Sequence, residues 1–247
     1  MFETLLRSFV AGAKSLGLNF SFLTSAYERG MWLDGIRTTL ELAAATIPAS
    51  LAAGIVLTLA LRSPRRWLSV PSRAFIELTR STPTLVQLDC AFLALNMLVS
   101  AALGGVEHNP LTPFVWCVLV IALHIGAFHA EALRAGIGTV PEATGEAARA
   151  LGFGRAEILW RIELPIAFRV ALPALTNNLV NLVKLTAIGS AIAVGDITYA
   201  SIMIWTQHDN VIELMIFILI LFSALNFIVS RAGSWLETRL RMPGHGV

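Results

Sequence analysis

Long runs without a charged residue constrain this chain more than any other feature of its sequence. A helix needs about 20 apolar residues to cross the ~30 Å hydrocarbon core of a bilayer, and residues 42–61 supply such a run. Four comparable runs follow, and Lys184 is the single charge that interrupts them. They lie at residues 90–106, 111–128, 170–195 and 214–230. The sequence therefore predicts an all-α membrane protein with about five transmembrane helices.

Composition disfavours the soluble classes of protein. Charged residues make up 14% of the chain and hydrophobic residues 56%, whereas a soluble domain carries about 25% charged residues. The formal net charge is only +2, so we expect no nucleic-acid partner. Cys90 and Cys117 both lie inside apolar runs, a placement that indicates neither a disulfide framework nor a zinc site.

The distribution of basic residues predicts the orientation. Most of the 18 Lys and Arg residues follow the first or third apolar run or lie near the C-terminus, whereas the segments 104–111 and 206–210 contain none. The clustered residues are Arg62, Arg65, Arg66, Arg73, Arg80, Arg134, Arg149, Arg155, Arg161, Arg169, Arg231, Arg239 and Arg241. By the positive-inside rule, we expect these residues and the C-terminus in the cytoplasm and the N-terminus outside.

The N-terminal segment, residues 1–30, follows a different pattern. Apolar residues recur there every three or four positions from Phe2 to Phe20, with basic residues elsewhere around the helix. This pattern is typical of an amphipathic helix in the membrane interface, and the basic residues argue against a secretory signal peptide. Two roles stay open for this helix: packing on the protein's own spans, or contact with a partner.

A motif with fixed spacing occupies the polar loop at residues 138–165. An acidic residue and two alanines are followed after three residues by a glycine, and nine residues later by an Ile-x-Leu-Pro sequence. The motif residues are Glu146, Ala147, Ala148, Gly152, Ile162, Leu164 and Pro165. This E-A-A-x3-G-x9-I-x-L-P pattern resembles the signature loop of permease subunits in ATP-binding-cassette (ABC) importers.

The residue types in this loop predict its local structure. Residues 142–151 are rich in Ala and Glu and favour a helix, which Gly152 and Gly154 are expected to end. Residues 155–162 can form a second short helix, and Pro165 suits the start of the next span. The expected product is a helix–turn–helix with small side chains, a shape that suits insertion into a groove on another protein.

The resemblance implies a type I ABC importer permease fold and several partners. The 138–165 loop would be the ATPase-coupling element, docked into a cleft of a cytoplasmic ABC ATPase dimer whose closure moves the spans. A second permease subunit, the same or a similar chain, and an extracytoplasmic solute-binding protein would complete the complex in a bacterial inner membrane. We expect a single permease domain at residues 31–240 and a tail at 241–247. ATP and Mg²⁺ would bind the partner ATPase, and no cofactor would bind this chain.

Three further segments narrow the resemblance to permeases for polar amino acids. They are similar to the family's "RgTPLLVQL", "AYxAEixRGGIxSVPxGQ" and "NxxixLlKDTSL" sequences and lie at residues 80–88, 127–141 and 181–187. Thr84 stands where leucine is usual, and Leu185 and Ala187 replace the Asp and Ser of "KDTS". The alternatives are opines or another small polar solute, or a secondary transporter, a class that usually shows more spans and inverted repeats.

Polar residues within the spans are candidates for the substrate path. A charge at the bilayer centre costs at least about 2.5–3.5 kcal/mol, so Lys184 is a functional candidate. Asn177 and Asn181 share its helix face, and an amino-acid carboxylate needs such partners. Thr186 and Asp89 complete the predicted path. In the alternative, Lys184 snorkels or pairs at a subunit interface, and the asparagines bond between helices. Asp89 could bind an α-amino group or pair with Lys184 or Arg80.

No residue pattern predicts catalysis or a metal site. His124, His129 and Glu131 do not recur at the i, i+4 spacing that paired histidine ligands use, and Glu131 is better placed for an ion pair with Arg134. The chain contains no Gly-x-Ser-x-Gly sequence, phosphate-binding glycine loop or Cys–His pairing. We therefore expect no catalytic residues, no metal and no enzymatic activity in this chain.

Overall fold

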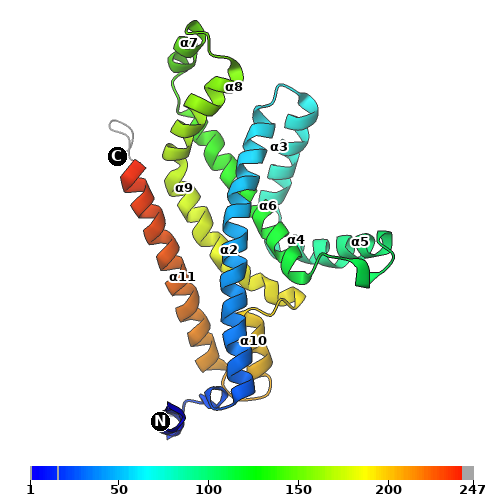
Figure 1. The fold of residues 1–247 in the computed structure, drawn as a ribbon, viewed down its shortest axis with the longest axis vertical. Coiled ribbons are helices and arrows are strands. Elements are labelled where there is room, and N and C mark those ends of the chain that lie inside the picture. The colour runs from blue at the N-terminus through cyan, green and yellow to red at the C-terminus, as the bar shows by residue number, and fades with distance from the viewer. Residues whose placement is uncertain (1, 16, 241–247) are drawn as a thin grey trace. The chain divides into compact units, whose positions relative to one another are not determined.

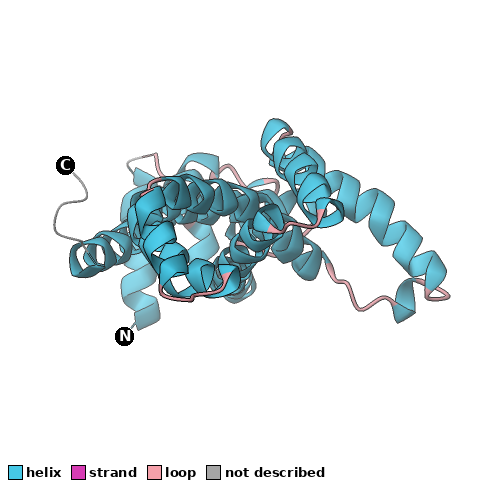
Figure 2. Ribbon diagram, turned by 90° about the horizontal axis from the view of Figure 1, so that it is seen from above, coloured by secondary structure: helices cyan, strands magenta, loops and turns pink. Residues whose placement is uncertain are grey.

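The computed structural model describes residues 2–15 and 17–240, and all regular structure within them is helical (Figures 1 and 2). The predicted tail, residues 241–247, lies outside the described residues. The elements are α1 (Phe2–Ser15), η1 (Ser21–Leu23), α2 (Ala26–Arg62), α3 (Arg66–Ser81), α4 (Thr84–Asp89), η2 (Cys90–Leu95), α5 (Asn96–Ala102), η3 (Val106–His108), α6 (Pro113–Gly138), α7 (Glu142–Ala150), α8 (Arg155–Ile158), η4 (Leu159–Glu163), α9 (Leu164–Leu185), η5 (Thr186–Ile192), α10 (Ile197–Trp205) and α11 (Val211–Leu240).

The predicted all-α membrane fold is confirmed, with four uninterrupted candidate spans among the described residues and a fifth that is broken. The uninterrupted spans are Ala26–Arg62, Thr84–Ala102, Pro113–Gly138 and Val211–Leu240. Most of these helices extend well beyond the apolar runs, and polar residues make up their additional turns. The second span instead begins before its run and contains the π-helical segment η2.

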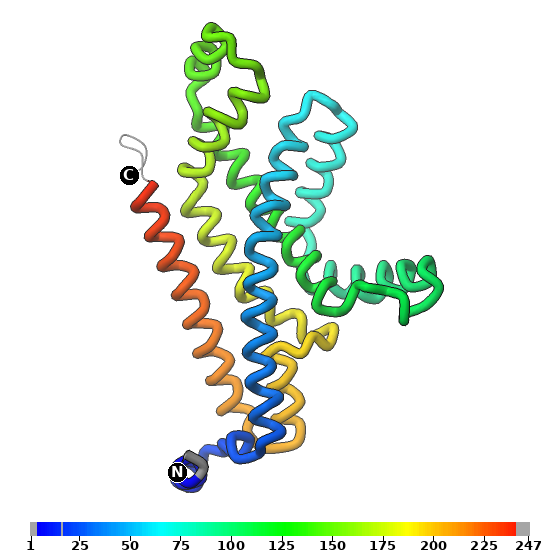
Figure 3. The backbone as a smooth tube through the Cα atoms, in the orientation of Figure 1, coloured from blue at the N-terminus to red at the C-terminus, as the bar shows by residue number. Residues whose placement is uncertain are grey.

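The fourth predicted span, residues 170–195, is helical only up to Ile192, where the helix breaks. Helix α9 ends at Leu185, and the chain continues without a gap as the 3₁₀ segment η5. After a short break α10 follows, and the helix before the break and α10 are bent by 48° relative to each other (Figure 3). Ala193 in the break has a left-handed backbone, φ 58°. Asp196 then caps α10, because its carboxylate accepts the backbone N–H of Tyr199 at 2.8 Å.

The chain forms two compact units that interleave along the sequence. The first unit comprises Met1–Ala45, Leu88–Val118 and Val183–Asn226, and the second comprises Thr46–Gln87, Leu119–Leu182 and Phe227–Val247. In the first unit, the side chains of Phe22, Ile204 and Leu214 form a buried core. Trp32 and Phe217 pack against this core, and the centroids of their two rings lie 5.3 Å apart.

Close helix contacts characterise the second unit. The core of Ile76, Ala127 and Ala130 joins α3 to α6. A Cβ atom added to Gly54 of α2 would lie 2.5 Å from the Cβ of His129, and one added to Gly126 would lie 2.7 Å from the Cβ of Ala53. Such small-residue contacts let helix backbones approach within a membrane.

The predicted N-terminal amphipathic helix is present as α1. Ala13 is buried, and the ring of Phe9 lies 5.5 Å from that of Phe20, which follows the helix. Leu5 and Phe9 nevertheless stay 64% and 56% exposed. Helix α1 therefore contacts the protein through Ala13 and one side of the Phe9 ring. The exposed surfaces of Leu5 and Phe9 stay available for the membrane interface.

Candidate functional site

The 138–165 loop folds as a helical hairpin whose turn depends on Gly152. Helix α7 ends with two hydrogen bonds: the N–H of Gly152 donates to Arg149 O at 2.9 Å, and the N–H of Phe153 donates to Ala148 O at 3.1 Å. This pair of bonds is the Schellman arrangement. It requires a left-handed residue after the helix, and Gly152 has φ +87°. The predicted helix and its glycine cap are both present.

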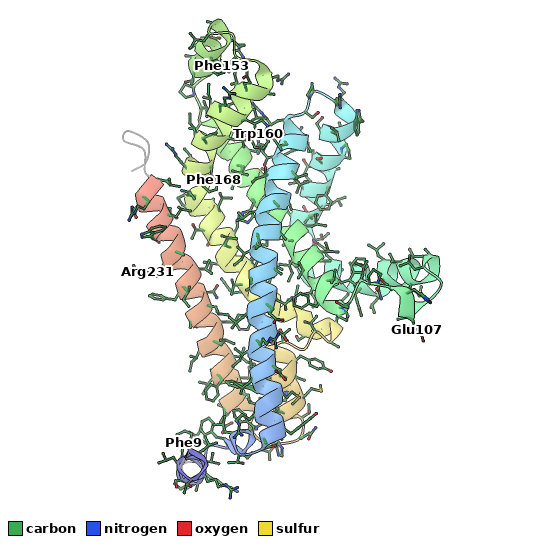
Figure 4. All side chains as sticks on the ribbon, in the orientation of Figure 1. Phe9, Glu107, Phe153, Trp160, Phe168 and Arg231 are labelled. Atoms are coloured by element: carbon green, nitrogen blue, oxygen red, sulfur yellow. The ribbon has the colours of Figure 1, made fainter. Side chains whose placement is uncertain are left out.

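The motif side chains divide into an exposed and a buried set. Glu146, Ala147 and Gly152 are exposed, whereas Ala148 is 4% exposed. Phe153 lies beside the turn of the hairpin (Figure 4). The exposed surface next to the turn therefore combines the small motif residues with the side chain of Leu151, which is 77% exposed, while Ala148 is buried.

The second half of the loop differs from the prediction in two ways. Gly154 does not end α7 but begins α8, where its N–H donates to Glu157 Oε2 at 3.1 Å. The second helix also does not stop before the next span: it continues through the π-helical segment η4 into α9. Pro165 has no N–H to offer the carbonyl of Arg161, which accounts for the wider helical turn directly before it.

A small apolar core fixes the base of the loop. Leu164 of the motif packs with Ile137 and Ala167, and Leu59 of α2 packs against this cluster. Helices α6 and α9 meet closely here, since a Cβ added to Gly136 would lie 2.5 Å from the carbonyl oxygen of Ala167. Ile162 is half-buried and Pro165 is exposed. Movement of the loop would therefore be transmitted directly to α9 and its neighbours.

An ion pair that the sequence did not indicate lies next to this core. Arg62 at the end of α2 pairs with Glu163 at the end of η4. Hollows of about 730 Å³ and 620 Å³ are both lined by Arg62, Glu163 and Arg149. The predicted Arg134–Glu131 pair is also present at 2.8 Å, and Arg80 lies 3.7 Å from the same carboxylate.

Three of the predicted substrate-path residues lie on one helix: Asn177, Asn181 and Lys184 are all exposed on α9. Thr186 follows in η5, where its buried hydroxyl donates to Val183 O at 2.8 Å, and Asp89 is half-buried at the end of α4. No ion pair is recorded for Asp89 or Lys184 within the described part of the chain. The substrate path stays a prediction.

His129 and His124 bond to polar side chains of their own unit. The His129 ring lies 3.4 Å from both Ser50 Oγ and Asn178 Nδ2. Because the Asn178 amide donates to Nδ1, Nε2 carries the proton and donates to Ser50. Among residues 2–15 and 17–240, no three His, Cys, Asp or Glu side chains are placed to share a metal ion. The two hydrogen bonds of His129 join α6 to α2 and to α9.

His124 joins α6 to the segment where α3 ends and α4 begins. Its Nε2 lies 2.9 Å from Thr84 Oγ1, and its Nδ1 lies 3.3 Å from Gln87 Oε1. The Gln87 amide donates to Thr79 O and Thr82 O, so its oxygen accepts from the ring and Thr84 donates to Nε2. Thr84, which stands where leucine is usual in the similar family sequence, is therefore the hydrogen-bond partner of His124.

Asp196 is a further polar group that the sequence reasoning missed. It is fully buried, and the neighbouring N–H of Ile197 donates to Thr39 Oγ1 of α2 at 3.0 Å. A Cβ added to Gly35 would lie within 3.0 Å of Asp196 O. The Gly-Asp pair before an apolar run was the available signal, since Asp is a favoured N-cap. These contacts join the start of α10 to α2 in the first unit.

Comparison with known proteins gives a consistent result. Residues 47–242 match the family described as binding-protein-dependent transport system inner membrane component. The octopine transport system permease protein OccM of Rhizobium radiobacter is 32% identical over 213 residues, which cover 84% of this chain and 85% of OccM. The glutamate transport system permease protein GluC of Corynebacterium efficiens is 35% identical over 80% of this chain and 86% of its own length.

A solved structure supports the same fold. An amino acid ABC transporter crystallised with histidines matches with a TM-score of 0.71 and 28% identity, covering 88% of this chain and 98% of that chain. The agreement extends over nearly the whole length of both chains.

Proposed function

The chain belongs to the family of binding-protein-dependent transport system inner membrane components, and on that premise we propose that it is the permease subunit of an ATP-driven ABC importer for polar amino acids. It is a multi-pass inner-membrane protein. The 138–165 loop carries the proposal, because its complete motif folds into an exposed hairpin closed by Gly152 at φ +87°. Such a hairpin suits docking into a groove of an ATPase.

The proposed complex contains partners that this chain requires. Five spans are few to enclose a path, so a second permease subunit, the same or a similar chain, would complete it. A cytoplasmic ATPase dimer would bind ATP and Mg²⁺, so that this chain binds no cofactor and catalyses no reaction. A solute-binding protein would deliver the ligand outside. The arginine-rich segments and the C-terminus would face the cytoplasm, with the N-terminus outside.

Transport would follow from alternating access. ATP binding would close the ATPase dimer and shift the loop, and the path would open outward; hydrolysis would reset it. Each ligand contributes only through its different affinity for the two states. The continuous helix from Arg155 to Ile192 links the loop to the broken fourth span, which suits it to carry this motion.

Two cargo classes follow from the relatives. A glutamate permease supports a polar amino acid, and an octopine permease similar over 84% of this chain supports an opine as the second candidate. The complex, purified with its ATPase and solute-binding protein and placed in liposomes, is expected to hydrolyse ATP faster when arginine, glutamine, glutamate or histidine is added. Stimulation by octopine alone would select the second candidate. A chain that purifies without an ATPase would contradict both.

Lys184 is the test of the predicted substrate path. Lys184→Ala should lower uptake of a subsaturating amino acid at least about tenfold, because a hydrogen bond to a charged group contributes about 1.5–3 kcal/mol. Uptake into the liposomes and substrate-stimulated ATPase activity measure the effect. Lys184→Arg, which keeps the charge, is the matched control and should retain more uptake. Unchanged transport and unchanged stimulation in Lys184→Ala would remove Lys184 from the path.

A further inference from the structure

The Arg62–Glu163 pair joins two elements that are far apart along the chain. Arg62 is the last residue of α2, and Glu163 is the last residue of η4, 101 positions later. Their side chains are 39% and 19% exposed. The other ion pair in this region, between Arg161 and Glu157, joins only neighbouring turns of one helix at 3.6 Å. The Arg62–Glu163 pair thus connects the end of α2 to the end of η4.

Two hollows border this ion pair, and only part of the space around it is filled by side chains. Leu59, one turn earlier on α2, packs against the core of Ile137, Leu164 and Ala167. The hollows of about 730 Å³ and 620 Å³ both have Arg62 and Glu163 in their walls, and Leu59 also lines the larger one. Residues of the end of α2 and residues of the loop thus face the same open spaces, which side-chain packing does not fill. The ion pair bridges this gap.

The two helices reached by the loop differ in how they are attached. Helix α9 continues the loop through unbroken backbone, so displacement of the hairpin moves α9 directly. Helix α2 has no such continuity with the loop and meets it through side chains. The wider π-helical turn at η4 ends on Glu163, and such turns often occur at functional sites.

We propose that the Arg62–Glu163 pair is the positioning contact that couples displacement of the 138–165 loop to helix α2. This inference rests on the proposed function, since it assigns a role within ATP-driven transport. Arg62 and Glu163 touch neither substrate nor nucleotide in this role. They act by holding the end of α2 to the loop, so that α2 and α9 move together when the ATPase closes.

The test measures molecules transported per ATP hydrolysed in the complete complex in liposomes. Because both side chains are partly exposed and ion pairs near the surface contribute little to stability, the variants should still assemble. Glu163→Arg and Arg62→Glu should each lower this ratio at least fivefold while ATP hydrolysis continues. The double variant R62E/E163R restores opposite charges and should return the ratio to within twofold of wild type. A merely structural role would alter assembly without changing the ratio.

Matched removals provide the control. Glu163→Ala should uncouple transport, whereas Arg37→Ala, which removes a local ion pair with Glu41 on α2 outside the loop, should leave the ratio within twofold of wild type. If Glu163→Arg fails to assemble, Glu163→Gln carries the same expectation.

Two results would overturn the proposal: a wild-type ratio in the single variants, or a double variant no better than they are. A wild-type complex that no tested solute stimulates would instead overturn the proposed function, and this inference with it.

Discussion

Replacing Gly152 by Asp should abolish transport while leaving membrane insertion intact. Gly152 has φ +87°, and a Cβ added there would meet no other atom within 4 Å. Asp tolerates this backbone better than most residues, so the hairpin should still form. Its charged side chain would, however, project from the turn that is proposed to enter the ATPase. Uptake should fall at least tenfold, which corresponds to about 1.4 kcal/mol or more of lost coupling.

Gly104 offers a matched control for this change. Its φ is +85°, and a Cβ there also meets nothing within 4 Å, but it lies in the arginine-free segment at residues 104–111. Gly104→Asp imposes the same backbone strain and the same charge away from the loop, and should transport near the wild-type rate. Uptake and ATPase co-purification compare the two variants. Wild-type uptake by Gly152→Asp would remove the coupling role from the loop.

Local signals in the sequence were sufficient for much of the loop. Ala and Glu favour a helix over α7, and Gly152 provides the left-handed cap that the following chain requires. The role of Gly154 was misjudged because glycine also occurs at N-caps. Its neighbour Glu157 three positions on, which accepts the Gly154 N–H at 3.1 Å, was the distinguishing signal.

Contacts between distant residues were beyond sequence reasoning. Apolar residues fill residues 170–195 whether the backbone is an α-helix, a 3₁₀ segment or a break, so hydropathy located the fourth span without its interruption. The pairing of Arg62 with Glu163 depends on where α2 and η4 end in space, and neither residue stands out in a charged loop. Likewise, Thr84 was seen as a departure from a motif, but its partner His124 required the fold.

Replacing Gly136 by Ala should destabilise the protein even though alanine is the better helix former. Gly136 lies within α6, and its added Cβ would lie 2.5 Å from Ala167 O and 3.1 Å from two further backbone atoms of Ala167. Backbone atoms cannot rotate away as a flexible side chain does, so α6 and α9 would have to separate at the core beneath the 138–165 loop. Overpacking of this kind costs about 1–3 kcal/mol.

The last residue of the same helix should respond in the opposite direction. A Cβ added to Gly138 meets nothing within 4 Å, so Gly138→Ala should be neutral or stabilise the protein by up to ~1 kcal/mol through helix propensity. Thermal unfolding of the two variants in detergent should place the Tm of Gly136→Ala several degrees below that of Gly138→Ala, since about 1 kcal/mol shifts Tm by roughly 2–4 °C at this size. Equal Tm values would mean that α6 and α9 do not pack at Gly136, and the loop would then lack the rigid base through which its motion is proposed to reach α9.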